Sequence, residues 1–500
     1  MQFRSIVGLL AMLTLGLSLL SVEAPAQQAD KKNVLVIVTD DLGRQDVTPF
    51  NPDTFYETPN IQRIADSGMK FTDAYVSNPV CSPSRYSMVT GKYPSRVDAT
   101  DFFRGNRTGR YNHAPYNYYM PVSEKTISEA FNEGGYATYF AGKWHLGPEP
   151  KHWPKNQGFD VNKGGYSSGA PYYSDDTGYF SPYKNPRLED GPKGEYLPYR
   201  LADETSRFIK EHQDEPFFAY LSFYEVHNPK AAPEALIEKY RKKKQKLGLD
   251  DVDKFERIEQ VWPNKGPRKV RVVQSHPVYA AMVEALDRSV GQVLDTLEET
   301  GQADNTIVVF LSDHGGLSTS EGHNTSNRPL RGGKGWIYEG GILTPLMVRW
   351  PGVTKPGSVS DQPVMSNDLY PTLLEATGLA KRPAQHQDAK SFVPILKGKD
   401  AIDRGPLYWH YPHYSNQGGP PAGGIRIGPW KLVERYEDGS VELYNVEKDI
   451  DESDNLADQH PDRVKRMRQK LHTWYQEVDA KFLRQKGDGP EPWRPAYMKK

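Results

Sequence analysis

Four segments of this chain are almost continuously apolar, and each of them ends in polar residues. They span residues 33–41, 137–145, 217–227 and 306–315. Apolar runs with little alternation are typical of strands that helices cover on both faces. Because the carboxyl ends of parallel strands meet at one edge of a sheet, we expect the four polar ends to converge there.

Two further patterns predict the rest of the fold. Segment 279–299 has apolar residues at three- and four-residue spacing, which predicts an amphipathic helix. After about residue 405, short alternating segments separated by turn residues predict antiparallel strands, and 461–482 predicts another amphipathic helix. We therefore predict an α/β fold with a large, mainly parallel sheet sandwiched by helices in 27–404, and a smaller antiparallel sheet with a terminal helix in 405–500.

The first 26 residues have the pattern of a signal peptide. Arg4 precedes a short apolar run, and Ala24-Pro25-Ala26 matches the small-x-small pattern of a cleavage site. The run is short for a membrane span, and a lipid anchor would require a cysteine directly after it. The sequence thus predicts an exported protein, periplasmic or secreted, without a stable membrane anchor.

The composition contains a single cysteine, and its setting is unusual. The chain has 500 residues, a formal net charge of -1 and 37% apolar residues, a balance that gives no indication of nucleic-acid binding. Cys81 has no partner for an intrachain disulfide and lies among Pro, Ser and Arg, where a loop is predicted to enter a helix. An exported thiol of this kind is exposed to oxidation, so the residue is a candidate for chemical modification.

Two acidic pairs directly follow predicted strands and indicate a metal site. They are Asp40-Asp41 and Asp313-His314. Adjacent carboxylates repel one another unless a cation lies between them. Mainly oxygen ligands favour Ca²⁺ or Mg²⁺, although another divalent ion is possible because imidazole suits softer metals. Taken singly, each pair is more often a helix N-cap.

The motif Cys81-Ser82-Pro83-Ser84-Arg85, with Thr90-Gly91 downstream, resembles the Cys-x-Pro-x-Arg signature of type I sulfatases. Segment 135–147, GYATYFAGKWHLG, resembles the second signature of that family. The resemblance extends from residue 33 to the C-terminal helix. It implies an arylsulfatase-like enzyme of the alkaline phosphatase superfamily, of the exported bacterial polysaccharide sulfatase type.

In that family the motif cysteine is oxidised to formylglycine (3-oxoalanine), which would explain the lone Cys81. The resemblance implies a partner for this step, either a formylglycine-generating enzyme or an anaerobic sulfatase-maturating enzyme. As a hydrated aldehyde, residue 81 would carry two hydroxyls on one carbon. One attacks sulfur, and loss of the proton from the other expels sulfate and regenerates the aldehyde.

The resemblance also implies roles for other residues. Arg85 would stabilise the hydrate, Lys143 would bind sulfate, and His145 would assist collapse of the sulfated adduct. One or both of His227 and Lys334 would contact sulfate, and one of them would protonate the leaving oxygen. The metal would be held by Asp40, Asp41, Asp313, His314 and residue 81. Many family members carry Asn where this sequence has His314.

The implied substrate is a sulfated polysaccharide or oligosaccharide, with a weak preference for sulfated galactose or an amino sugar. Loops would select the sugar, and their candidates are equally well explained by surface packing. A basic run at 239–246 is more consistent with a solvated helix face than with a patch that attracts anionic polymers. The candidates for sugar selection are the Tyr-rich segment 164–186, Arg104, Arg331, and the segment 410–426 with His410, His413 and Arg426.

Three alternatives remain open from the sequence. Formylglycine-dependent phosphonate and phosphoester hydrolases share the superfamily fold. A catalytically inactive carbohydrate-binding relative is a second possibility. A thiol enzyme is a third, but it would leave the acidic pairs without an explanation.

Overall fold

The computed structural model describes residues 31–498 apart from 104, 106, 108, 172–177 and 260–267. The expected signal peptide, 1–26, lies outside these residues. Within the described part of the chain, no helix has the length and apolar character needed to cross a membrane.

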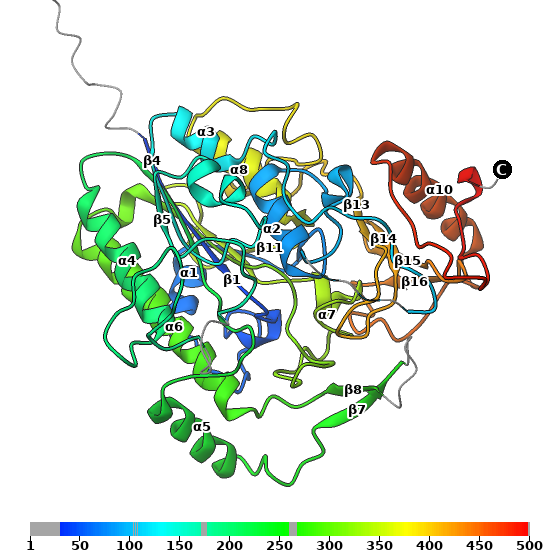
Figure 1. Ribbon diagram of the computed structural model, residues 1–500, viewed down its shortest axis with the longest axis horizontal. Coiled ribbons are helices and arrows are strands. Elements are labelled where there is room, and N and C mark those ends of the chain that lie inside the picture. The colour runs from blue at the N-terminus through cyan, green and yellow to red at the C-terminus, as the bar shows by residue number, and fades with distance from the viewer. Residues whose placement is uncertain are drawn as a thin grey trace, which may run out of the picture.

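An eight-stranded sheet runs through the larger part of the molecule (Figure 1). Its order is β11-β2-β10-β9-β1-β6-β4-β5, and the four strands at its centre are the four predicted from apolar runs. These central strands are parallel to one another, whereas β10 is antiparallel to both of its neighbours. The eight strands are β1 (Asn33–Thr39), β2 (Met69–Phe71), β4 (Ala137–Gly142), β5 (Val161–Lys163), β6 (Phe217–Ser222), β9 (Thr306–Ser312), β10 (Leu346–Arg349) and β11 (Ser358–Ser360).

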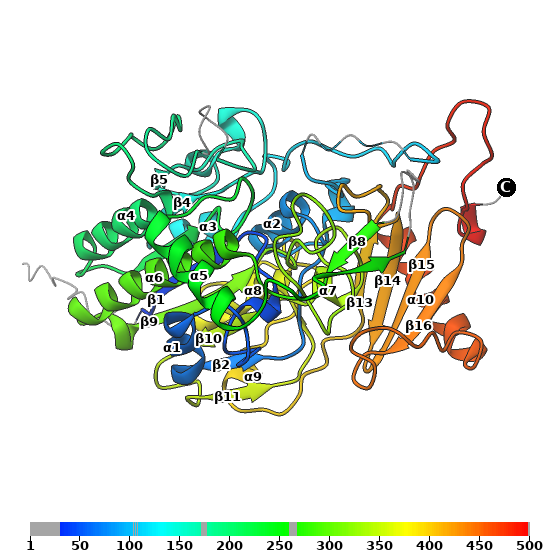
Figure 2. The same cartoon turned by 90° about the horizontal axis from the view of Figure 1, so that it is seen from below.

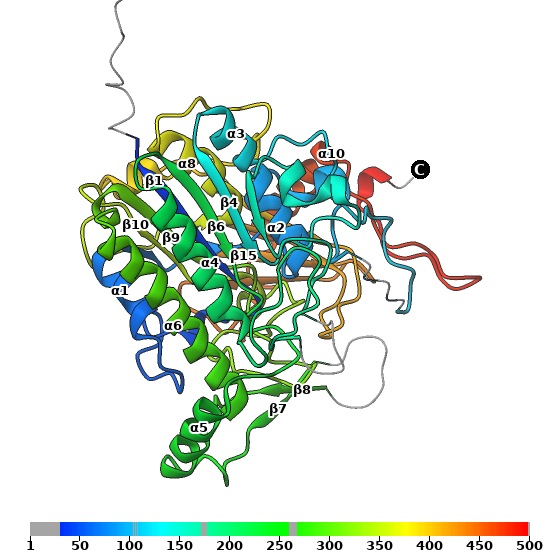
Figure 3. The ribbon, with the colours of Figure 1, turned by 60° about the vertical axis from the view of Figure 1, so that its left-hand side comes forward.

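Helices cover both faces of this sheet, as its continuously apolar strands predict. On β1, Val34, Val36 and Val38 belong to one hydrophobic core, whereas Leu35 and Ile37 belong to the other. Figure 3 shows two long helices lying across one face of the strands. That face carries α1 (Pro59–Ser67), α4 (Leu197–Glu211) and α6 (Pro277–Glu299), and the other carries α2 (Cys81–Thr90), α3 (Ile127–Glu133) and α8 (Leu369–Ala376).

The predicted C-terminal sheet is present, with four antiparallel strands beside the large sheet (Figure 2). The terminal helix is shorter than the predicted 461–482, since it ends at Glu477. Asp479 then adopts a left-handed backbone conformation (φ 51°), which turns the chain out of the helix. These elements are β13 (Leu407–Tyr411), β14 (Ala422–Ile427), β15 (Trp430–Arg435), β16 (Val441–Asn445) and α10 (Pro461–Glu477).

A charged insertion separates β6 from α6. Its helix, α5 (Glu234–Lys246), carries the basic run, and Lys239 and Lys243 pair with Glu57 at 2.5 and 3.0 Å. This arrangement supports a solvated helix face. The hairpin that follows pairs β7 (Phe255–Ile258) with β8 (Arg268–Arg271). The remaining short elements are β3 (Ala74–Tyr75), β12 (Val364–Met365), α7 (Glu339–Ile342) and α9 (Val393–Leu396).

Candidate active site

The two acidic pairs lie side by side because their strands are neighbours in register. Thr39, the last residue of β1, is paired with Ser312, the last residue of β9. Asp40-Asp41 and Asp313-His314 therefore leave the sheet at the same point of its carboxyl edge. The predicted convergence of polar strand ends is confirmed, and all four residues are buried.

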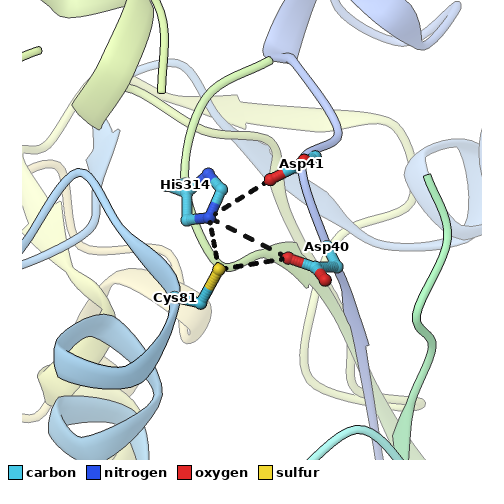
Figure 4. A group of neighbouring side chains, drawn as sticks. All are labelled: Asp40, Asp41, Cys81 and His314. Carbon is cyan, nitrogen blue, oxygen red and sulfur yellow. Dashed lines mark hydrogen bonds and ion pairs between the residues drawn. The ribbon is translucent and has the colours of Figure 1, made fainter. Parts of the chain in front are cut away.

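Cys81 is the first residue of α2 and points into this group (Figure 4). Its Sγ lies 3.2 Å from His314 Nε2 and 3.6 Å from Asp40 Oδ1. One ligand atom from each of Asp40, Asp41, Cys81 and His314 fits within 4.8 Å of the others. Asp313, the fifth predicted ligand, lies outside that group of four. Its Oδ1 is 3.4 Å from His314 Nε2.

Two buried lysines compensate the carboxylates. Lys143 Nζ lies 2.5 Å from Asp40 Oδ2, and Lys334 Nζ lies 2.6 Å from Asp41 Oδ1. Burial raises the pKa of Asp40, but nearby cations, led by Lys143, outweigh it and hold that pKa well below its usual value. Both carboxylates are therefore charged at neutral pH.

Two glycines allow the lysines to reach these positions. A Cβ on Gly142, which precedes Lys143 and has φ 95°, would lie 1.9 Å from the carbonyl oxygen of Ser222. A Cβ on Gly333, before Lys334, would lie 2.4 Å from the carbonyl oxygen of Gly316. Only residues without a side chain permit such close approach of the backbones.

Arg85 holds the centre together from one turn into α2. Its Nε donates to Asp313 Oδ2 at 2.9 Å, and its Nη1 donates to Ser222 Oγ at 2.6 Å and to the Lys143 carbonyl at 3.0 Å. Asp40 Oδ1 lies 3.9 Å from Nη2. Ser222 was not among the residues singled out in the sequence, although its place at the end of an apolar strand is the same signal that identified Asp40.

The donor set fits a divalent cation. Asp41 Oδ2 is buried and accepts no hydrogen bond from the described residues, so its lone pairs are free to bind a cation. Three fully buried carboxylates in contact are costly to maintain unless positive charge lies among them. Oxygen donors joined by one imidazole suit Ca²⁺, Mg²⁺ or a softer divalent ion.

A cavity of about 740 Å³ opens onto the cluster. Cys81, His145, His227 and Lys334 line it, which brings together predicted residues from four distant parts of the sequence. The chain is not extended after Lys143, because His145 has φ 58°. The left-handed turn still places both residues at the site.

The two cavity histidines are held uncharged. Burial, followed by the charges of Lys143 and Arg85, lowers the pKa of His145 well below its usual value. Burial and Lys334 likewise lower the pKa of His227. His227 Nδ1 lies 2.6 Å from the carbonyl oxygen of Asn228, which can only accept, so Nδ1 carries the proton.

Loop residues form much of the cavity wall. Phe102, Phe103 and Tyr118 line one part of the wall, and Asn416 and Gln417 line another. Asn416 and Gln417 belong to the segment 410–426 that the sequence singled out, whereas the pattern around Phe102, Phe103 and Tyr118 contains no strand or motif signal that would have identified them. Within the Tyr-rich segment, residues 167–170 also reach the cavity, while 172–177 lie outside the described residues.

Several residues expected to select the sugar have structural contacts instead. Arg331 pairs with Glu259 at 3.0 Å, and Arg426 pairs with Asp73 at 2.5 Å. His410 is buried, with Nδ1 2.6 Å from Tyr436 Oη and Nε2 2.8 Å from the Lys481 carbonyl oxygen. His413 is also buried, and its Nε2 lies 2.8 Å from Thr100 Oγ1. Arg104 lies outside the described residues.

Comparison with known proteins agrees with this geometry. Residues 32–379 match the model of the family described as Sulfatase, and 333–481 match the model described as N-sulphoglucosamine sulphohydrolase, C-terminal. A sulfatase from Formosa agariphila is 32% identical, covering 89% of this chain and 88% of that protein. The dog N-acetylgalactosamine-6-sulfatase is 29% identical over 76% of this chain and 68% of its own length.

Among solved structures, Ps i-CgsB in complex with k-i-k-neocarrahexaose has a TM-score of 0.71 and 29% identity, covering 89% of this chain and 92% of that one. The fold and site define an alkaline phosphatase-like hydrolase with a buried group of carboxylates, Cys81 and His314 that could hold a metal ion. The chain belongs to the sulfatase family and is a sulfuric ester hydrolase.

Proposed function

We propose that this protein hydrolyses a sulfate monoester on a carbohydrate, with residue 81 acting as a formylglycine nucleophile. One observation carries the proposal. The lone cysteine lies at the start of a helix, at the floor of a cavity, in contact with Asp40 and His314 and close to two buried lysines. Cationic side chains are needed around a sulfate ester because its oxygens repel a nucleophile unless they are screened.

Two groups would complete the site. Asp40, Asp41, Asp313 and His314 would hold a divalent ion, Ca²⁺ in the first instance, which supplies electrostatic screening of the reacting sulfate. Formylglycine, formed from Cys81 by a maturation enzyme, would supply a second hydroxyl through which sulfate is released. These two groups also explain why an exported chain would keep a single thiol among carboxylates.

The chain's own residues would bind, orient and move protons. Lys143 and Lys334 would bind sulfate oxygens, and Arg85 would orient residue 81 through its hydrogen bonds to Asp313 and Ser222. His145 is uncharged and its Nδ1 is buried without a hydrogen-bond partner, so it is suited to accept the proton from a hydroxyl on residue 81. The leaving oxygen would take its proton from Lys334, or from His227 when Nε2 also holds a proton, because Nδ1 already donates to the Asn228 carbonyl oxygen.

A carbohydrate substrate is supported by what the relatives act on or bind. One curated relative is named for N-acetylgalactosamine 6-sulfate, and the solved structure Ps i-CgsB is in complex with a neocarrahexaose. The cavity wall is also suitable for a sugar, since hydroxyl, amide and aromatic side chains all line it. Export to the periplasm or beyond, indicated by residues 1–26, would bring such an enzyme to polysaccharides.

The test is the mass of the peptide containing residues 78–96, taken from protein produced together with a maturation enzyme. We expect the mass change of a thiol replaced by an aldehyde at Cys81, together with hydrolysis of 4-nitrophenyl sulfate. Cys81→Ala should abolish that hydrolysis. Ser84→Ala changes a position of the motif that is neither Cys, Pro nor Arg, and it should retain both the modification and the hydrolysis.

The same preparation separates the alternatives. An unmodified thiol, in a cell that matures a control sulfatase, would contradict the proposal and favour a thiol enzyme or an inactive relative. The 3.2 Å contact between Cys81 Sγ and His314 Nε2 is one that a thiol enzyme would also need. Faster hydrolysis of a phosphonate ester than of any sulfate ester would assign the formylglycine to the other hydrolase class.

A further inference from the structure

A carboxylate lines the cavity that would receive the sulfate group. Among the described residues that line it, Glu321 is the single acid, and Lys334 and His227 line the same cavity. Burial lowers the pKa of Lys334, but negative charges, led by Asp41 and including Glu321, raise that pKa well above its usual value. A fixed negative charge weakens the binding of a sulfate ester beside it, so Glu321 does not serve the sulfate group itself.

The backbone holds Glu321 in place on a tightly turned loop. Glu321 and His323 both have left-handed conformations, with φ 52° and 47°, which are uncommon for residues with a side chain and persist where neighbouring contacts enforce them. Asn228 Nδ2 donates to the Glu321 carbonyl oxygen at 2.6 Å, and Arg271 Nε donates to that of His323 at 2.5 Å. The carboxylate therefore extends from a fixed backbone at the cavity wall.

A second loop continues the polar wall beside Glu321. Ser320 Oγ donates to the carbonyl oxygen of Asn416 at 3.3 Å, and Thr319 Oγ1 donates to that of Gln417 at 2.8 Å. Asn416 and Gln417 line the cavity as well. The two loops thus place a carboxylate and two side-chain amides along one stretch of the wall, and a few polar groups of this kind fix the orientation of a bound ligand.

The charge of Glu321 is not neutralised by a cation within the described part of the chain. Its carboxylate forms no ion pair and no hydrogen bond there, since only its backbone carbonyl is engaged. Lys230, on the neighbouring loop, donates to Asn324 Oδ1 at 3.0 Å, and Lys334 is paired with Asp41 at 2.6 Å. The carboxylate can therefore accept hydrogen bonds from a ligand, and its charge repels anions.

Glu321 lies on the side of the cavity where the sugar would be bound. In the proposed function the leaving oxygen takes its proton from Lys334 or His227, so these two residues face the sugar to which that oxygen belongs. The charge of Glu321 acts on Lys334, and its carbonyl oxygen binds Asn228, the residue after His227. The hydroxyls next to the reacting sulfate would therefore lie near Glu321.

We propose that Glu321 selects the sugar, accepting hydrogen bonds from free hydroxyls of the sugar unit that bears the reacting sulfate and repelling a second anionic group on that unit. This inference rests on the proposed function and narrows its substrate class to saccharides whose target unit carries one sulfate and no carboxylate. A hydroxyl that donates to a carboxylate forms a charge-assisted hydrogen bond, which is stronger than one between neutral groups. A second sulfate in the same place would meet a like charge instead.

Turnover by matured enzyme tests this role. The substrates are galactosides and N-acetylgalactosaminides, as methyl glycosides and within trisaccharides, with one sulfate or with two sulfates on the same unit. We expect Glu321→Gln to lower kcat/KM for the best monosulfated glycoside by about tenfold relative to 4-nitrophenyl sulfate, which has no hydroxyl, since a hydrogen bond to a charged group contributes about that much. The wild type should prefer the monosulfated glycoside to its disulfated counterpart, and the variant should narrow that preference.

Glu256→Gln is the matched control. Glu256 lies on β7, pairs with Arg328 and does not line the cavity. The substitution therefore removes a negative charge near the same loop without touching the substrate, and we expect every kcat/KM to remain at the wild-type value. Equal losses in Glu321→Gln and Glu256→Gln would show a general effect of charge and overturn the inference.

The comparison between substrates gives the other decisive results. An equal loss of Glu321→Gln on the glycoside and on the aryl sulfate would overturn selection by Glu321, as would a wild type that hydrolyses disulfated glycosides at least as fast as monosulfated ones. Hydrolysis of the aryl sulfate but of no glycoside would also overturn it, while the sulfatase chemistry would stand. Absence of both activities in the matured wild type would count against the proposed function, from which this selection follows.

Discussion

At the scale of single residues, short motifs carried most of the information about the site. Cys81 with Arg85, and Lys143 with His145, could be placed in a common pocket because each pair has a fixed spacing within a recognisable motif. Phe103 and Tyr118 could not, since each is one aromatic residue in an ordinary loop. Their importance depends on long-range packing, which single residues do not reveal.

His314 offers a test at this scale, because it places an imidazole among oxygen donors. We expect His314→Asn to lower the affinity for Zn²⁺ by at least about tenfold, since even changes to residues that only contact a metal ligand lower metal affinity by that factor. Ca²⁺ binding should be retained, because the Asn side chain supplies an oxygen donor. Thermal unfolding of metal-stripped protein titrated with each ion gives the two affinities. His323→Asn, outside the cluster, is the control, and an unchanged ratio of the two affinities would contradict His314 as a ligand.

At the scale of elements, the apolar periodicity predicted the central strands, α6 and the C-terminal strands. It overextended the terminal helix, because an amphipathic pattern continues past Glu477 to the buried Phe482 although Asp479 has already turned the chain. Apolar side chains are buried both in a helix and in an irregular segment that packs on the same surface, so both give a similar sequence pattern. The pattern therefore could not mark where the helix ends.

The contact between β13 and the segment after α10 should make stability depend on pH. Burial lowers the pKa of His410 to about 3, whereas in the unfolded chain a histidine has a pKa of about 6.5. As the pH falls from 7 to 5, only the unfolded state takes up this proton, so the free energy of unfolding should fall by about 2 kcal/mol from this residue. The contribution is fully present above pH 7.

Urea unfolding of the wild type and His410→Gln at pH 7 and pH 5 measures this effect. The wild type should lose about 2 kcal/mol more than the variant between the two pH values, because Gln does not titrate. His460→Gln serves as the control, since His460 packs against Trp430 near the surface. Parallel losses in wild type and His410→Gln would show that His410 is protonated in the folded protein as well.

At the scale of the whole molecule, the predicted boundary at residues 404 and 405 does not separate two cores. Leu407, Trp409 and Leu432 of the C-terminal sheet belong to the same hydrophobic cluster as Val36 and Met88 of the larger part. The change in sequence texture near residue 405 marks a change of architecture, from parallel to antiparallel strands. We expect a chain ending at residue 404 to fail to fold, because it would expose that shared core.

A buried ion cluster joins these two parts near the loop that carries Lys334. Lys431 on β15 has a fully buried Nζ, which lies 2.8 Å from both Glu339 Oε1 on α7 and Glu452 Oε1. Glu339 N donates to Glu452 Oε2 at 2.7 Å, so the two carboxylates face one another across the lysine. The C-terminal sheet thereby supplies the cation that holds α7 in place, five residues after Lys334.

Lys431→Met should therefore destabilise the protein by about 3–5 kcal/mol, the typical cost of removing one partner from a buried ion pair. It should also lower kcat on 4-nitrophenyl sulfate, because α7 and the loop before it lose their anchor. Adding Glu452→Gln to Lys431→Met should restore at least about half of the lost stability. The second substitution removes one of the two facing negative charges, and the remaining carboxylate, Glu339, is still stabilised by the positive charge of Arg426. Urea unfolding followed by tryptophan fluorescence measures each step, with the exposed Lys448→Met as control. A surface ion pair contributes up to about 1 kcal/mol. If the free energy of unfolding of Lys431→Met lies within that value of the one for Lys448→Met, the cluster does not anchor the two parts.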